Sequence, residues 1–354
     1  MKEQHEQQEQ QHDITSKWIC TANHGFIAYA QEELRRRFGQ VKAMVLIPSE
    51  VILVTLPADA EQVLRELQTD PLIFLRHIQP VQQEFNLSEA GQEELNTAIV
   101  SFVQSHHELL SGQSVAIQIR KGSNEAGPID LGLMKSAIEA GLNDTGLETV
   151  TRDSDWIVSI FVGKDSVYVG VSTPAANLSD WSGGALRFQR EEGQISRAKF
   201  KLLEAERSFG LDLAAFSEGL DIGAAPGGWT SLLLERGLKV TAIDPAEMHP
   251  SLTANRRLTV LKKNASEVKF HESQFDLIVC DMSWSPMQMV RLVMDLLYAL
   301  RSGGTAIITV KLMHKKPLQT IRDITEKFSE HMEIRRMKQL VHNRDEITLY
   351  MVKY

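Results

Sequence analysis

The fold of this 354-residue chain is decided by the stretch Asp221-Ile222-Gly223-Ala224-Ala225-Pro226-Gly227-Gly228-Trp229. An apolar run enters this stretch at Leu220, and an apolar helical pattern leaves it over residues 229–234. The order predicts a strand, a tight loop and a helix, because glycine permits sharp turns. The first N–H groups of a helix have no partner within it, so the loop offers donors to a ligand.

The spacing of the glycines indicates S-adenosylmethionine (SAM) as that ligand. It does not match the G-x-G-x-x-G pattern of dinucleotide-binding loops, and no Gly-Lys-Ser/Thr follows, as a P-loop requires. An acid at the strand end, followed by small residues, suits a nucleoside that carries an amino acid. The alternative is an ordinary strand-to-helix turn. We predict that the following residues bind SAM: Asp221, Gly223, Ala224, Ala225, Pro226, Gly227, Gly228 and Trp229.

Strands and helices alternate through the second half of the chain. This alternation predicts a Rossmann-like, doubly wound α/β domain over residues 196–354. A short polar connection joins the last two apolar segments, 334–340 and 347–352, which predicts a hairpin with an antiparallel final strand. Five earlier apolar segments are strand candidates: 220–222, 240–243, 258–261, 275–280 and 305–310.

Polar residues gather at the carboxyl ends of these strands, where ligands bind in such sheets. Asp221 ends the first strand, Asp244 the second and Asp281 the fourth. Asp244 is placed to accept hydrogen bonds from both hydroxyls of a ribose. Asn264 and Ala265 follow the third strand, in a turn that could contact an adenine. One such Asp is commonly a helix N-cap, whereas three behind a glycine loop predict a cofactor site.

The first half of the chain predicts two smaller α/β units. Residues 1–16 are polar and rich in Gln, and we expect them to be disordered. Residues 17–85 read as strand, helix, two strands, helix and a strand at 72–75, the order of a ferredoxin-like domain. Residues 86–175 predict a second module with a hairpin at 163–165. Residues 176–195 predict a linker.

Composition predicts a cytoplasmic protein without a membrane partner. No apolar run is long enough to cross a bilayer, and the start lacks the apolar core of a signal peptide. The two cysteines cannot form a disulfide framework. The net charge of −8 argues against a nucleic-acid partner, but residues 191–354 carry about +2 and the remainder about −10. The basic pairs of the second half therefore permit RNA binding without requiring it.

Four charged residues stand where a reaction could occur: Lys201 before the sheet, Asp281 and Lys311 at strand ends, and Glu346 at the start of the last strand. A lysine that closes a buried strand is costly unless it is paired. A structural ion pair of Lys311 with Asp281 or Glu346 is the alternative to a catalytic role. No His, Cys and Asp residues have the spacing of metal ligands, so we expect no metal.

The motifs around these residues resemble those of the RrmJ/FtsJ class of RNA ribose 2′-O-methyltransferases. Within that class, the chain is most similar to the RlmM family, which methylates a cytidine of 23S rRNA. The resemblance covers nearly everything except the Gln-rich tail. The motifs that carry it are Ser196-Arg197-Ala198, Lys201-Leu202, 221–229, Cys280-Asp281-Met282, Val310-Lys311-Leu312, 343–348 and, in the front half, 64–67 and 71–74.

The resemblance implies SAM as cofactor, 23S rRNA as partner and a THUMP-like RNA-binding domain at 86–175. It also implies a catalytic tetrad of Lys201, Asp281, Lys311 and Glu346. A ribose 2′-hydroxyl must lose a proton as it attacks the methyl group of SAM, and we assign Lys311 as the base. Only a neutral amine can act so, and desolvation or a second lysine favours that form. Lys201 and Asp281 would orient the base, and Glu346 would position Lys201 or the ribose.

Three other hypotheses are open at this point. The chain could be a non-catalytic RNA-binding or ribosome-assembly protein, a methyltransferase of another RNA such as tRNA, or a small-molecule O-methyltransferase. The complete tetrad argues against the first, and the added front half argues against the last. Methylation of a base amine is disfavoured, because Asp281-Met282-Ser283-Trp284 stands in place of Asp/Asn-Pro-Pro-Tyr. Trp284 could stack on a flipped nucleotide or pack within its loop.

Overall fold

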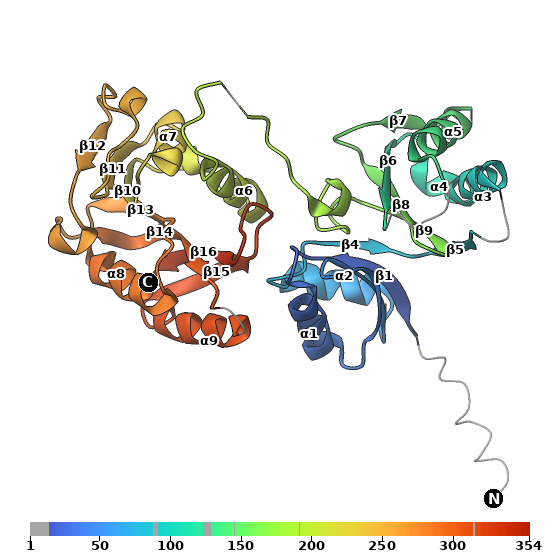
Figure 1. The fold of residues 1–354 in the computed structure, drawn as a ribbon, viewed down its shortest axis with the longest axis horizontal. Helices are drawn as coiled ribbons and strands as arrows, with labels where there is room; N and C mark the ends of the chain where they lie inside the picture. The colour runs from blue at the N-terminus through green and yellow to red at the C-terminus, as the bar shows by residue number, and fades with distance from the viewer. Residues whose placement is uncertain (1–13, 88–90, 123–128, 145, 191, 314–315) are drawn as a thin grey trace, which may run out of the picture. The chain divides into compact units, whose positions relative to one another are not determined.

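The computed structural model describes residues 14–87, 91–122, 129–144, 146–190, 192–313 and 316–354. The chain forms two compact units, Met1–Ala185 and Leu186–Tyr354 (Figure 1). We expect residues 1–16 to be disordered, and all but the last three of them lie outside the described residues. No helix in the described part of the chain is long and apolar enough to cross a membrane.

The first unit begins with a four-stranded antiparallel sheet and two helices. The order along the chain is the predicted one, and the sheet order β2-β3-β1-β4 gives a ferredoxin-like arrangement. Helix α1 buries Ile27, Ala30 and Leu34, which the helical spacing placed on one face. The elements are β1 (Ser16–Thr21), α1 (Ile27–Phe38), β2 (Lys42–Ile47), β3 (Val51–Leu56), α2 (Ala60–Thr69) and β4 (His77–Pro80).

The prediction of a strand at residues 72–75 is wrong, because the strand β4 lies a few residues later. Residues 72–75 form a buried loop, in which Phe74 and Leu75 are fully buried. The Glu33 carboxylate of α1 accepts the backbone N–H groups of Ile73 and Phe74, each at 2.9 Å. The Glu33 side chain thus satisfies backbone N–H groups that a neighbouring strand would otherwise bind. An apolar run in the sequence does not distinguish a buried loop of this kind from a strand.

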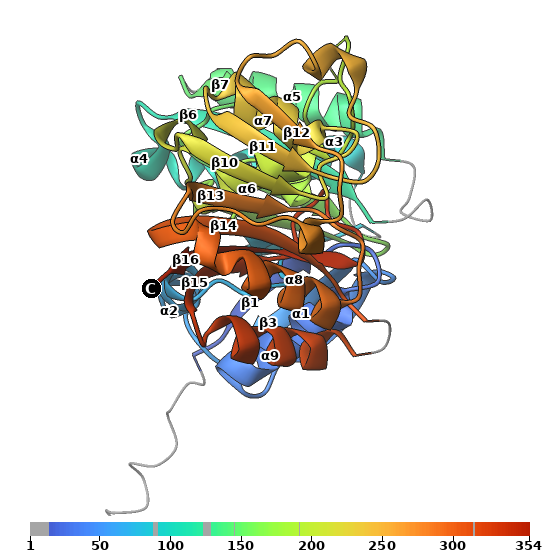
Figure 2. The same ribbon diagram turned by 90° about the vertical axis from the view of Figure 1, so that its left-hand side faces the viewer.

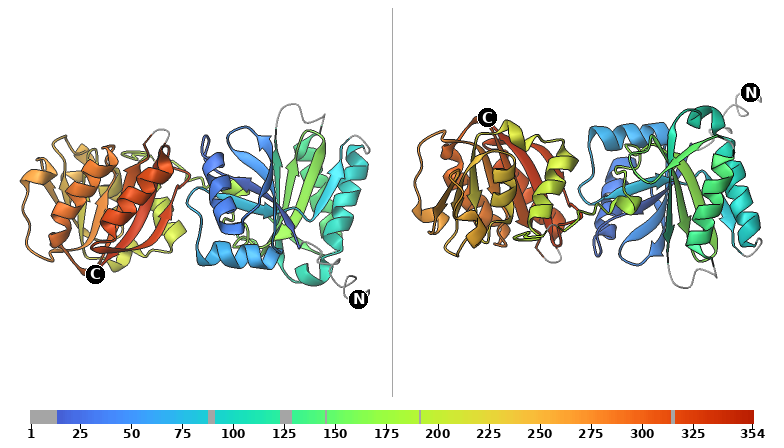
Figure 3. Two further views of the ribbon diagram at one scale, coloured as in Figure 1. Left: turned by 90° about the horizontal axis from the view of Figure 1, so that it is seen from below. Right: turned by 90° about the horizontal axis from the view of Figure 1, so that it is seen from above.

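The rest of the first unit is a mixed sheet of order β5-β9-β8-β6-β7. The predicted hairpin at 163–165 is confirmed, since it joins the antiparallel strands β8 and β9. Helices α3 and α5 lie side by side against this sheet (Figure 3). Ile99, Ile138 and Ile160 lie in the core that they enclose with it. The elements are β5 (Gln83–Asn86), α3 (Gln92–Gln104), α4 (His107–Leu110), β6 (Ser114–Lys121), α5 (Leu131–Asn143), β7 (Glu148–Val150), β8 (Trp156–Val162), β9 (Ser166–Ser172) and the turn η1 (Ser182–Gly184).

The second unit is a seven-stranded sheet of order β12-β11-β10-β13-β14-β16-β15 (Figure 2). The first five strands are parallel and β16 is antiparallel to both of its neighbours, so the predicted Rossmann-like fold with a final hairpin is confirmed. The strands are β10 (Glu218–Ile222), β11 (Lys239–Ile243), β12 (Leu258–Leu261), β13 (Phe275–Cys280), β14 (Leu300–Lys311), β15 (Met332–Lys338) and β16 (Glu346–Lys353).

Helices cover both faces of this sheet. Leu202 of α6 and Leu232 and Leu233 of α7 are fully buried in one core with the sheet, and α8 and α9 lie on the other face (Figure 1). The helices are α6 (Lys199–Phe209), α7 (Gly228–Glu235), α8 (Pro286–Leu296) and α9 (Pro317–Phe328), with short turns η2 (Leu213–Ala215), η3 (Pro250–Leu252), η4 (Ala265–Glu267) and η5 (Leu297–Ala299).

Candidate active site

The glycine-rich loop lies between β10 and α7, at the carboxyl end of β10. Gly223 has a φ of +73° and Gly227 a φ of +113°, which other residues rarely adopt. A Cβ on Gly223 would lie 2.2 Å from Met282 Cγ, and a Cβ on Gly227 would lie 2.3 Å from Leu252 Cδ1. The packing of the loop itself therefore requires both glycines, a reason that the sequence did not reveal.

Asp221 is buried at the base of this loop. Thr230 Oγ1, in the first turns of α7, donates to Asp221 Oδ2 at 2.6 Å. Burial raises the pKa of Asp221 to about 7, with a further rise from Asp281 and Asp244, while the Thr230 hydrogen bond opposes it. Asp221 thus ties the helix to the strand, and its contact with a cofactor stays a prediction.

Asp244 lies just after β11, half-buried, at the carboxyl end of the sheet. Its Oδ2 accepts the Ala225 N–H at 3.1 Å, and its Oδ1 accepts the Ala246 N–H at 2.8 Å. A carboxylate can accept about four hydrogen bonds, so positions are left for ribose hydroxyls. Asn264 is exposed beside the buried Ala265 at the start of η4. This set of acceptors and donors fits SAM.

Three of the four predicted catalytic side chains meet in one group, which we call the Lys201 cluster: Lys201, Asp281 and Glu346. Lys201 Nζ donates to Asp281 Oδ1 at 2.9 Å and to Glu346 Oε2 at 2.6 Å. The three side chains are 18%, 13% and 14% exposed. Burial lowers the pKa of Lys201, but the charges and hydrogen bonds of the two carboxylates outweigh burial and raise it. The two carboxylates therefore favour the charged form of Lys201, and the assignment of Lys311 as the base stays a prediction.

Lys311 is the last residue of β14 and lies directly opposite Glu346 of β16. Directly opposed residues of antiparallel strands point to the same face of a sheet. Lys311 therefore shares its face with the Lys201 cluster, and its side chain is exposed. In the described part of the chain, the lysine that forms the ion pairs with Asp281 and Glu346 is Lys201.

Two further residues of this region were not predicted from the sequence: Thr309, which contacts the cluster, and Glu204, which holds the segment before β16. Thr309 Oγ1 donates to Asp281 Oδ1 at 2.5 Å. Thr309 precedes Lys311 by two positions in β14, so the alternation of a strand puts both on one face and was a usable signal. Glu204, on α6, accepts the backbone N–H groups of Val341 and His342 at 2.7 and 2.9 Å. Nothing in the sequence pattern indicated that pairing.

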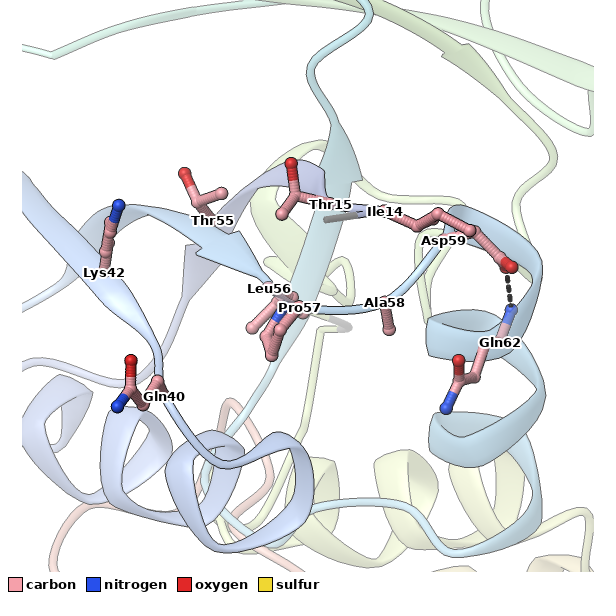
Figure 4. Close-up of a pocket in the computed structure, with 10 residues that line it drawn as sticks. All are labelled: Ile14, Thr15, Gln40, Lys42, Thr55, Leu56, Pro57, Ala58, Asp59 and Gln62. Carbon is pink, nitrogen blue, oxygen red and sulfur yellow. Dashed lines mark hydrogen bonds between the residues drawn. The ribbon is translucent and has the colours of Figure 1, made fainter. Parts of the chain in front are cut away.

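Among the described residues, no group of three or more His, Cys, Asp or Glu side chains is arranged to hold a metal ion. A cavity of about 620 Å³ opens in the first unit, beside β2, β3 and the start of α2, and none of the predicted site residues lines it (Figure 4). Polar groups on its wall include Lys42, Thr55, Asp59 and Gln62.

Residues 194–338 match the family model of FtsJ-like methyltransferases. The second unit is therefore an FtsJ-like methyltransferase domain, a class that takes its methyl group from SAM, and SAM is its cofactor. The crystal structure of TrmN from Thermus thermophilus covers 96% of this chain and all of its own, with a TM-score of 0.42 and 14% identity. At that score nothing about a substrate follows from the likeness.

Longer similarities connect the chain with proteins named ribosomal RNA large subunit methyltransferase M. The protein from Marinomonas sp. (strain MWYL1) is 30% identical over 320 residues, which are 84% of this chain and 86% of the relative. The chain belongs to the family of these proteins. The protein from Laribacter hongkongensis is 32% identical over 205 residues, which are 54% of this chain and 57% of the relative. The chain spans 50% of the relative from Halorhodospira halophila.

Proposed function

We propose that the chain is a SAM-dependent RNA ribose 2′-O-methyltransferase whose target is a cytidine of 23S rRNA. The Lys201 cluster carries this proposal. It joins a lysine to two carboxylates at 2.9 and 2.6 Å, on the same sheet face as a second, exposed lysine, Lys311. Met282 packs against Gly223 of the glycine loop, so the neighbouring Asp281 lies beside the loop that would hold SAM.

The catalytic residues and the cofactor-binding residues have separate roles in the proposed reaction. SAM, when bound, supplies an activated methyl group. Lys311 accepts the proton that a ribose 2′-hydroxyl must lose, as a general base does. The positive charge of Lys201 favours the neutral form of a neighbouring lysine, and Asp281 and Glu346 hold Lys201 in place. Asp244, Asn264 and the loop of residues 223–229 would hold the cofactor.

RNA is the partner that the other observations favour. The relatives are named as methyltransferases of large-subunit ribosomal RNA. Trp284, just after Asp281, is 45% exposed and therefore available to stack on a base. The THUMP-like domain at 86–175 stays part of this proposal, as a second contact for RNA. An enzyme of ribosomal RNA in a bacterium would act in the cytoplasm.

Transfer of tritium from labelled SAM into 23S rRNA tests the proposal. Lys311→Ala should lower the rate by about 100-fold or more, the usual contribution of a general base, while SAM binding stays as in the wild type. Lys239→Ala is the matched control, since Lys239 is an exposed lysine at the start of β11 that pairs with Glu218. Equal transfer by the Lys311 and Lys239 variants would overturn the assignment of the base.

A further inference from the structure

We propose that three aromatic rings next to the Lys201 cluster bind unpaired bases of the RNA beside the methylated nucleotide. The rings belong to Phe188, Phe200 and His342, and we call them the aromatic platform. Their centroids lie 5.4 Å apart for Phe188 and Phe200, 5.4 Å for Phe188 and His342, and 5.5 Å for Phe200 and His342. The inference rests on the proposed function and specifies which form of RNA the site takes.

The aromatic platform and the Lys201 cluster are built on the same two segments. Phe200 directly precedes Lys201 in α6, and His342 lies four residues before Glu346. The 2.6 Å bond between Lys201 and Glu346 ties these segments together. The same helix and the same segment before β16 therefore carry both the aromatic platform and the Lys201 cluster.

Glu204 fixes the platform before any ligand arrives. Its carboxylate, 5% exposed, accepts His342 Nδ1 at 2.7 Å and also the backbone N–H groups of Val341 and His342. An ionised carboxylate only accepts, so Nδ1 is the donor. The ring keeps 22% of its side chain exposed, and Phe188 and Phe200 are also partly exposed. A ring that is already ordered loses little entropy on binding.

Four arginines accompany these rings along the chain, and all four are exposed: Arg187, Arg190, Arg197 and Arg344. None of the ion pairs found within the described residues uses one of them. The guanidinium groups are therefore available to phosphates, while the rings offer faces on which bases stack. This combination of stacking surface and positive charge recognises single-stranded nucleic acid. Duplex RNA keeps its base faces stacked inside the helix, so it would not fit.

The test compares the dissociation constants of two RNA probes for the full chain saturated with SAM. The probes are a single-stranded RNA of about 12 nucleotides that contains cytidine, within the site sizes of such proteins, and the same strand in a duplex. The wild type should prefer the single strand. Phe188→Ala should weaken single-strand binding by about 10-fold, the usual effect of losing one stacking ring, and raise the KM for RNA with little change in kcat.

Two matched variants separate stacking from packing. Phe188→Tyr keeps a ring and should bind the single strand like the wild type, whereas Phe188→Leu keeps an apolar side chain and should bind as weakly as Phe188→Ala. Restored affinity in Phe188→Leu, equal binding of both probes by the wild type, or no effect of Phe188→Ala would overturn the inference. Lys311→Ala should bind the single strand normally without methylating it. A wild type that methylates no RNA would instead refute the proposed function.

Discussion

Replacing Lys201 by methionine should destabilise the second unit by about 3 kcal/mol at pH 8. Methionine keeps an apolar stem of similar length but removes the charge that lies 2.9 Å from Asp281 and 2.6 Å from Glu346. Both carboxylates, 13% and 14% exposed, would then lose the cation that bridges them. Removing one partner of a buried ion pair costs about 3–5 kcal/mol, and the remaining exposure of the group places our expectation at the low end.

Urea unfolding of the wild type and the Lys201 variant, followed by tryptophan fluorescence, to which the buried Trp229 of the second unit contributes, measures this loss. Lys239→Met is the control, since Lys239 is 67% exposed in its pair with Glu218 and its replacement should have little effect. A Lys201→Met protein as stable as the wild type at pH 8 would refute the reasoning.

Three further changes have expected outcomes. As the pH rises from 4 to 7, the wild type should lose stability by up to about 1.4 kcal/mol per pH unit, because burial raises the Asp221 pKa from its ordinary 3.8 to about 7. Asp221→Asn should abolish this loss, and thermal unfolding across that range measures it. The wild type should lose stability as the pH falls below 6.5, because burial holds the pKa of His77 well below that value and only the unfolded chain takes up the proton. His77→Phe should abolish this loss, and urea unfolding at pH 5 and 7 measures it. Gly223→Ala should cost about 2 kcal/mol or more through positive φ and a clash with Met282, which Met282→Ala should partly relieve.

Each of these changes has a matched control. Asp295→Asn replaces an exposed carboxylate and should leave the pH profile as it is. His24→Gln, which replaces a histidine that is 76% exposed, is the control for His77→Phe. Gly112 has the same φ of +73° but no neighbour within 4 Å, so Gly112→Ala isolates the backbone strain. Gly223→Ala that is no worse than Gly112→Ala would contradict the clash, and unchanged profiles at Asp221 or His77 would contradict the pH arguments.

Local patterns made the fold of the second unit predictable. Alternating apolar segments, a glycine loop and acids at successive strand ends each depend on a few neighbouring residues, and the sheet has the expected order of elements. The prediction of a strand at 72–75 is wrong because the same apolar run can be buried as a loop when another group accepts its backbone N–H groups. Glu33, about 40 positions earlier, is that group.

The candidate site was predictable only with the help of a resemblance. Lys201 and Glu346 are 145 positions apart, and no periodicity or spacing in the chain predicts that they touch. The same holds for Glu204, whose partners Val341 and His342 are 137 and 138 positions away. A polar side chain finds its partner through tertiary packing, so these supports become visible only in three dimensions. The roles of the four catalytic candidates and of the cofactor-binding residues stay predictions.

The proposed function requires methyl transfer to a ribose of 23S rRNA. The most direct test incubates the wild-type chain with SAM and 23S rRNA that lacks the modification, digests the RNA to nucleosides and identifies the methylated product by mass spectrometry. We predict 2′-O-methylcytidine, with the added methyl group on the sugar. A methyl group on a base, or no methylated nucleoside in 23S rRNA, would contradict the account.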